Sequence, residues 1–169
     1  MAEIGNDQRG IHTMAHEPKM REEPDRVKIR ILLDSANQQG IKSESVWAEF
    51  VGPDQYRVLN SPFYFFGLSA EDIVKADRTA GSLEFRGVIA RGGHSTYRVF
   101  LQGDRTIRDT DFRDCWAPIS ALGATFENAN DHFIAVDIPP GKNIAEAYRL
   151  LEKGEEDGIW AFEEAHYQA

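Results

Sequence analysis

Residues 91–98 (Arg-Gly-Gly-His-Ser-Thr-Tyr-Arg) gather the side chains best suited to bind a ligand. Paired glycines let the backbone approach a bound group closely. Backbone amides beside arginine, histidine and serine can hold an anion or a carboxylate. The candidate ligand site therefore comprises Arg91, Gly92, Gly93, His94, Ser95 and Arg98. The simpler interpretation is a flexible corner where the chain leaves one sheet and enters another.

Catalysis by this corner is not expected. Ser95 and His94 are adjacent, and adjacent residues of an extended strand point to opposite faces, so they do not form a hydrolase dyad. The chain has no G-x-S-x-G motif, and its Gly-Gly pair lacks the lysine and the following helix of a phosphate-binding loop. We expect no enzymatic activity and no cofactor.

Metal binding is not expected either. The three histidines outside the N-terminal segment, His94, His132 and His166, are far apart in sequence and have no short-range partner. The single cysteine, Cys115, excludes an internal disulfide and a cysteine-based zinc site. A reducing cytoplasm is therefore the expected location.

The acidic charge is concentrated near the C-terminus. The formal net charge is −9, and residues 125–169 hold ten acidic and three basic side chains. An acidic surface repels nucleic acid and attracts basic proteins, although such a surface can also serve solubility alone. The candidate partner-binding residues are Glu152, Glu155, Glu156, Asp157, Trp160, Glu163, Glu164 and Tyr167.

Two further features bound the class of protein. No stretch of the chain approaches the roughly 20 apolar residues that span a bilayer, so no membrane association is expected. Residues 1–25 are polar and lack apolar periodicity, which predicts a disordered tail.

The elements that must position the corner begin after this tail. Val27, Ile29 and Ile31 alternate with polar residues, which is typical of a half-buried strand. Further short strands follow at regular spacing, with turns expected at residues 52–54 and 80–81. The aromatic run at residues 63–66 is interpreted as a core or inter-domain contact rather than a base-stacking platform, because it lacks interleaved basic residues. We expect residues 26–93 to form a β-rich, barrel-like subdomain.

The pattern changes after Gly93. A strand at residues 97–101 precedes a helical face over residues 112–122, which Pro118 is expected to kink or break near Ala117. A strand pair follows, then a helix over residues 142–153 with Gly154 as its C-cap, and a last strand over residues 159–167. This β-α-β-β-α-β order predicts a ferredoxin-like subdomain over residues 94–169. The fold class is therefore α+β.

Several segments together resemble an uncharacterised bacterial family known as domain of unknown function 4265. The resemblance is carried by residues 46–49, 56–63, 67–69, 72–74, 92–99, 135–139 and 158–164. It spans residues 27–167 and implies a bacterial origin and a cytoplasmic setting, but no reaction.

Two functions remain open at this point. The leading hypothesis is a non-enzymatic protein-binding module, such as an immunity or antitoxin-like inhibitor of a basic bacterial toxin, which needs complementary shape and charge rather than catalytic groups. The alternative is a small-ligand or nucleotide-sensing regulatory domain that uses the corner at residues 92–98.

Overall fold

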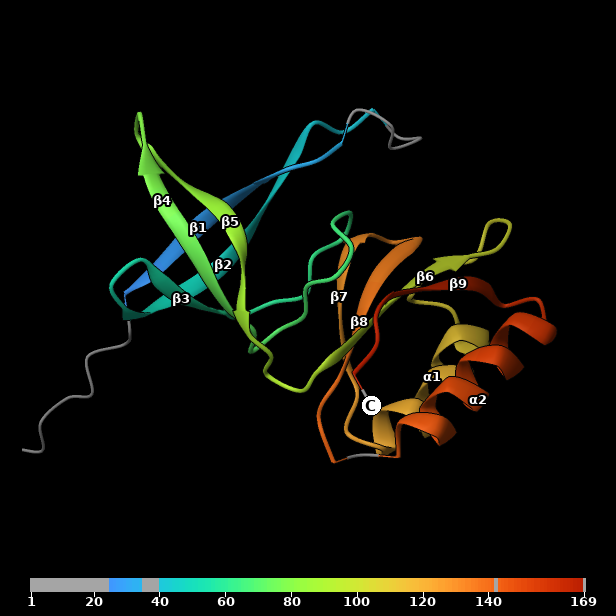
Figure 1. Cartoon of the computed structure of the whole chain (residues 1–169). Helices are drawn as coiled ribbons and strands as arrows, with labels where there is room; N and C mark the ends of the chain where they lie inside the picture. The colour runs from blue at the N-terminus through green and yellow to red at the C-terminus, as the bar shows by residue number, and fades with distance from the viewer. Residues whose placement is uncertain (1–24, 35–39, 142, 169) are drawn as a thin grey trace, which may run out of the picture.

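The computed structural model describes residues 25–34, 40–141 and 143–168, and within them the chain forms two β-sheets and two helices (Figure 1). The prediction of an α+β fold is confirmed. Of the predicted disordered tail, only Asp25 belongs to the described residues.

The first sheet is a closed barrel of five strands. Its strands are β1 (Arg26–Leu32), β2 (Ser43–Gly52), β3 (Gln55–Val58), β4 (Ile73–Thr79) and β5 (Ser82–Ala90). Ile29 and Ile31 are fully buried inside, whereas Lys28 and Arg30 face solvent, as alternation along a strand requires. The turns predicted at residues 52–54 and 80–81 connect β2 to β3 and β4 to β5.

The second sheet has four antiparallel strands in the order β7-β8-β6-β9. Its elements follow one another as β6 (Ser95–Leu101), α1 (Thr110–Ala121), β7 (Thr125–Asn130), β8 (Phe133–Ile138), α2 (Ile144–Glu156) and β9 (Trp160–His166). Both helices cover the same face of the sheet (Figure 1). They bury Phe112, Ile119 and Leu151 against Tyr97 and Val99 of β6. The opposite face of the sheet contacts the loop between β3 and β4, where Phe63 and Tyr64 pack on Phe133.

Helix α1 is not broken at Pro118. The helix continues through the proline to Ala121, and Ile119 is fully buried. A proline this close to the end of a helix removes one backbone hydrogen bond. The burial of Ile119 holds the last turn in place despite that loss.

Helix α2 begins at the Asn143 cap, whose side chain accepts a hydrogen bond from the Glu146 amide at 3.0 Å. The prediction that Gly154 ends the helix is wrong, because the helix continues to Glu156 and Gly158, with φ of +68°, follows the C-cap residue. Gly154 instead lies under the Trp160 indole, where an added Cβ would be 2.1 Å from Trp160 Cζ2. Neither of the two helices in the described residues has the length and apolar character needed to cross a membrane.

Candidate functional site

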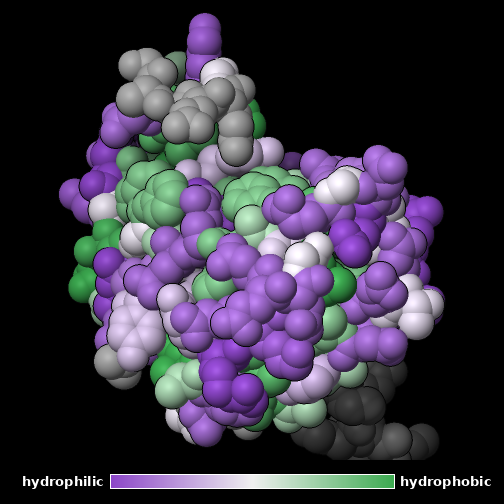
Figure 2. Space-filling view, turned by 90° about the vertical axis from the view of Figure 1, so that its right-hand side faces the viewer, coloured by the Kyte–Doolittle hydropathy of each residue, from purple (hydrophilic) through white to green (hydrophobic). Residues whose placement is uncertain are grey.

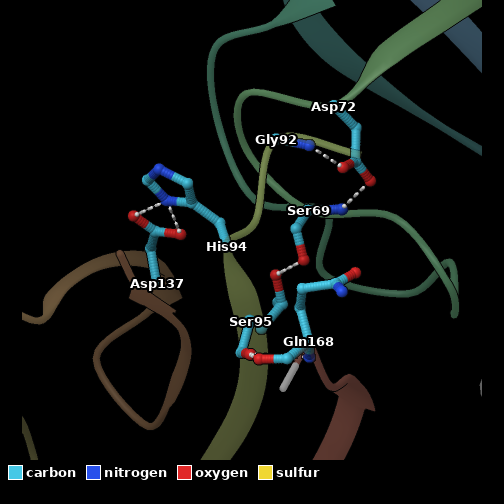
Figure 3. Close-up of polar contacts among 8 residues, drawn as sticks. Ser69, Asp72, Gly92, His94, Ser95, Asp137 and Gln168 are labelled. Carbon is cyan, nitrogen blue, oxygen red and sulfur yellow. Dashed lines mark hydrogen bonds and ion pairs between the residues drawn. The ribbon is translucent and has the colours of Figure 1, made fainter. Parts of the chain in front are cut away.

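The corner between the barrel and the second sheet is held by a buried carboxylate. Asp72 has no solvent exposure. It accepts hydrogen bonds from the Ser69 amide at 3.1 Å and from the Gly92 amide at 2.8 Å (Figure 3). It also accepts one from Arg91 Nη1 at 2.8 Å. Arg91 Nη1 also donates to the Gly67 carbonyl oxygen at 2.8 Å. Two predicted ligand-binding residues, Arg91 and Gly92, are therefore engaged inside the chain.

The paired glycines serve close packing of the backbone. A Cβ at Gly92 would lie 2.5 Å from the carbonyl carbon and oxygen of Glu71, so only glycine fits there. Gly93 has φ of +85°, in the left-handed region that favours glycine, and a Cβ there would be 3.0 Å from Pro140. Both positions are explained by the meeting of two chain segments, without a ligand.

His94 and Ser95 also have partners within the chain. His94 Nδ1 lies 2.9 and 3.0 Å from the two carboxylate oxygens of Asp137 on β8, and its other ring nitrogen is directed away from that carboxylate (Figure 3). Ser95 Oγ accepts a hydrogen bond from the backbone amide of Gln168 at 2.9 Å and lies 3.3 Å from the backbone carbonyl oxygen of the same residue. These contacts attach the start of β6 to its neighbours on both sides.

Arg98 differs from the other predicted ligand-binding residues, because part of its guanidinium group lacks a hydrogen-bond partner among the described residues. Its side chain is 5% exposed, and Nη1 donates to Glu163 Oε1 at 3.1 Å. Its guanidinium carbon lies 4.0 Å from the centre of the Phe66 ring, which is a cation–π distance. Nε and Nη2 have no hydrogen-bond partner among the described residues. Burial lowers the pKa of Arg98, while Glu163 opposes that effect.

A small cavity of about 70 Å³ separates the barrel loops from β7 and β8. Glu127 and Asp137 line it from the second sheet, and Ser61 lines it from the barrel side. Burial raises the pKa of Asp137, and the nearby His94 partly offsets this. Burial and the charge of Asp137 raise the pKa of Glu127. The cavity thus has room for a few water molecules beside two carboxyl groups that ionise less readily than usual.

The aromatic run at residues 63–66 joins the two sheets, as expected for an inter-domain contact. The Glu44 carboxylate accepts hydrogen bonds from the Phe63, Tyr64 and Phe65 amides and so fixes this loop. Phe63 and Tyr64 then pack edge-to-face on Phe133 of β8, with ring centres 5.6 and 5.7 Å apart.

The predicted partner-binding residues lie at the end of α2 and along β9. Seven of them are exposed: Glu152, Glu155, Glu156, Asp157, Glu163, Glu164 and Tyr167. Figure 2 shows that the side of the molecule where α2 ends and β9 begins is mostly hydrophilic. Glu155 and Glu156 belong to the last turn of the helix and not to a loop.

The prediction that Trp160 belongs to this set is wrong. It is 1% exposed, and its indole Nε1 donates to the Leu151 carbonyl oxygen at 2.9 Å. The residue faces the helices because β9 pairs with β6 in a register that opposes Trp160 to Leu101. A partner therefore cannot reach Trp160 on the surface of this fold.

His166 gives the corner a pH dependence that can be measured. Its Nε2 is buried without a partner in the part of the chain that the structure describes. Burial and the Arg91 charge lower its pKa. The folded state therefore binds fewer protons than the unfolded state, so stability is lost as the pH falls through the ordinary histidine pKa of about 6.5. We expect His166→Gln to flatten this part of the unfolding free-energy profile, measured by urea denaturation between pH 5 and 8.

The exposed His132 provides the control for this experiment. His132→Gln is expected to keep the loss of stability below pH 6.5. Equal slopes for wild type and His166→Gln would show that His166 does not resist protonation in the folded state.

Several residues of the corner were not predicted from the sequence, namely Asp72, Asp137, Glu127, Ser61 and Phe66. One local signal existed for Asp72. The spacing Ser69-x-x-Asp72 matches a capping box, in which an acidic side chain reaches back to an amide three residues earlier. The other residues meet through tertiary contacts that no short motif encodes.

Comparisons with known proteins identify the family and the fold. The model of the family described as "Domain of unknown function (DUF4265)" matches residues 44–162. A comparison with curated proteins finds no match. A crystal structure of a hypothetical protein from Neisseria gonorrhoeae is similar, with a TM-score of 0.72 and 18% identity over 88% of this chain and 99% of that chain. At this identity the similarity concerns the fold alone.

Proposed function

The chain belongs to the DUF4265 family, and we propose that it is a non-enzymatic protein-binding module whose acidic face binds a basic protein. The acidic face is defined as the exposed residues Glu152, Glu155, Glu156, Asp157, Glu163, Glu164 and Tyr167. The observation that carries the proposal is the exposure of so many carboxylates on one helix end and its adjoining strand.

The charge of this face is only partly neutralised. Lys153 Nζ binds Asp157 at 2.6 Å, and Glu163 binds Arg98. Glu152, Glu156 and Glu164 have no ion pair with any described residue. A surface with uncompensated negative charge steers a basic partner and raises its association rate, and salt weakens the effect.

Affinity would come from aromatic side chains beside these acids. Tyr148 is 39% exposed and Tyr167 is 46% exposed. Tyr148 packs edge-to-face on Phe162 at 5.4 Å between ring centres, so part of its ring is already held in place. A tyrosine fixed in this way loses little side-chain entropy on binding, which is typical of interface anchors. Tyr148 and Tyr167 replace Trp160 as the proposed anchors.

The specific class that we propose is an immunity or antitoxin-like inhibitor of a bacterial toxin, acting in the cytoplasm. Such an inhibitor covers a basic active site and needs no catalytic group of its own. Most polar groups of the corner at residues 91–95 are bound inside the chain, which favours a structural role for that segment over a catalytic one.

Small-ligand or nucleotide sensing at the corner is the second candidate. It is favoured by Arg98, a buried guanidinium with two nitrogens that lack partners among the described residues. It is disfavoured by the contacts that already occupy Arg91, Gly92, His94 and Ser95.

We also infer a ferredoxin-like arrangement for the second half of the chain. The element order β6-α1-β7-β8-α2-β9 and the strand order β7-β8-β6-β9 support it, because this is the split βαβ pattern. The barrel of β1–β5 supports the proposal of a β-rich subdomain over residues 26–93.

The test of the binding proposal is a charge reversal that spares folding. Glu155 and Asp157 accept hydrogen bonds from the Phe162 amide and Lys153, so they are left unchanged. The triple variant Glu152→Lys, Glu156→Lys and Glu164→Lys is expected to slow association with a basic partner about tenfold or more at low salt. The partner is sought among the products of neighbouring genes, and association is followed by stopped-flow mixing.

The matched control reverses three exposed acids on the barrel side of the chain, Asp25, Asp54 and Glu71, with the same change in net charge. It is expected to slow association much less. If both triple variants slow association equally, net charge alone accounts for the attraction and the acidic face is not the binding surface.

A further inference from the structure

A groove of about 380 Å³ lies on the outside of the barrel, beside β1 and the turn between β4 and β5. β1 and β5 run parallel and are paired only at Ile29–Leu83 and Arg30–Glu84. The β4–β5 hairpin then projects beyond β1, at the upper left of Figure 1. The short parallel pairing therefore leaves a hollow in the barrel wall at the turn end of this hairpin.

Three cationic side chains line this groove: Lys28, Arg30 and Arg78. All three residues are exposed, and none of them forms an ion pair with any described residue. Nearby carboxylates are already engaged, because Arg86 binds Asp77 at 2.9 Å and Glu84 at 3.3 Å. A chain with net charge −9 thus keeps three uncompensated positive charges around one hollow.

Polar groups suited to phosphate oxygens stand among these cations. Ser45 and Ser82 line the groove with their hydroxyl-bearing side chains, and Gly81 leaves the turn free of a side chain. Arginine guanidinium groups match phosphate oxygens in pairs, and serine hydroxyls donate to them. Mutual repulsion among the three cations would fall when an anion neutralises them.

From these observations we propose that the groove binds a small ligand with two or more linked phosphate groups. Three cations match the charge of a diphosphate or triphosphate better than that of one phosphate. A long nucleic acid is disfavoured, because the acidic remainder of the molecule would repel its backbone. The groove is separate from the acidic face, so this proposal stands independently of the one above.

The experiment titrates the full chain with inorganic pyrophosphate in metal-free, low-salt buffer, measured by calorimetry and by tryptophan emission. Lys28 Nζ lies 4.7 Å from the centre of the Trp47 ring, which is 45% exposed. A ligand that draws Lys28 away should change Trp47 emission, and Trp47→Phe should remove that change. We expect saturable 1:1 binding that is about tenfold tighter than binding of orthophosphate.

Variants assign the site. Arg30→Gln and Arg78→Gln are each expected to raise the Kd for pyrophosphate about tenfold, as loss of one charge-assisted contact requires. Arg113→Gln is the matched control, because Arg113 is exposed on α1 and forms no ion pair among the described residues. It should leave the Kd within about twofold, and thermal melting should confirm that all three variants are folded.

Further ligands distinguish the sources of the phosphate. If ATP binds more tightly than tripolyphosphate, the groove also recognises the nucleoside part of the ligand. If the two affinities are equal, the groove recognises the phosphates alone. Both results support the proposal. Absence of pyrophosphate binding, or equal weakening by Arg113→Gln, overturns it. Tighter binding of a single-stranded oligonucleotide than of tripolyphosphate, at equal phosphate concentration, would overturn it in favour of a nucleic-acid surface.

Discussion

Replacing Asp72 by alanine is expected to lower the free energy of unfolding by about 3 kcal/mol. The carboxylate is fully buried and accepts hydrogen bonds from Ser69, Gly92 and Arg91. Its removal leaves two backbone amides without an acceptor, and each such group costs about 1–3 kcal/mol where it is buried. Arg91 also loses one contact, but its Nη1 keeps the hydrogen bond to the Gly67 carbonyl oxygen. Because the Arg91 side chain is 39% exposed, water can replace part of its lost contact. The contribution of Arg91 to the loss of stability is therefore small.

The measurement is urea denaturation followed by far-ultraviolet circular dichroism. Asp77→Ala is the matched control, because Asp77 on β4 forms an exposed ion pair with Arg86 on β5, and exposed pairs contribute at most about 1 kcal/mol. Asp72→Asn should fall between wild type and Asp72→Ala, since the amide keeps one acceptor oxygen. If Asp72→Ala costs no more than Asp77→Ala, the buried carboxylate does not hold the corner together.

The strands were the features most readily predicted from the sequence. Alternation of Ile29 and Ile31 with Lys28 and Arg30 is a local pattern with a period of two residues, and the barrel interior preserves it. The residue at which α2 ends was harder to predict. Gly154 had the expected chemistry of a C-cap, but the chain uses its missing side chain to admit the Trp160 ring. A short motif cannot distinguish these two uses of glycine.

The candidate site was predictable only in outline. The corner at residues 91–98 does collect charged and polar side chains, but their partners come from distant segments. Asp72 lies 19 residues before Arg91, and Asp137 lies 43 residues after His94. The exposure of the acids on α2 followed from helix periodicity, whereas the burial of Trp160 depended on the register of β9 against β6. Contacts between segments that are far apart in the sequence therefore decide which polar groups remain free to bind a ligand or a partner.

Replacing Gly154 by alanine is expected to lower the free energy of unfolding by about 2 kcal/mol, although alanine is the better helix former. An added Cβ would lie 2.1 Å from Trp160 Cζ2 and 2.2 Å from Cε2, far inside van der Waals contact. Both Gly154 and Trp160 are buried, so neither the helix nor the ring can move toward solvent without losing core contacts. Overpacking of this kind costs about 1–3 kcal/mol, and the clash places this site at the upper end, against a gain of about 1 kcal/mol in helix propensity.

Gly52→Ala is the control, because a Cβ there meets only Gln55 atoms at 3.9 Å and the backbone is not left-handed. It should change the free energy of unfolding by less than about 0.5 kcal/mol in the same urea titration. A double-mutant cycle then identifies the cause of the loss at Gly154. Trp160→Phe removes the part of the indole that the new methyl group would meet, so Gly154→Ala should cost less in that background than in wild type. Equal costs in the two backgrounds would mean that the indole is not what requires glycine at this position, and the close packing of α2 on β9 would lose its main support.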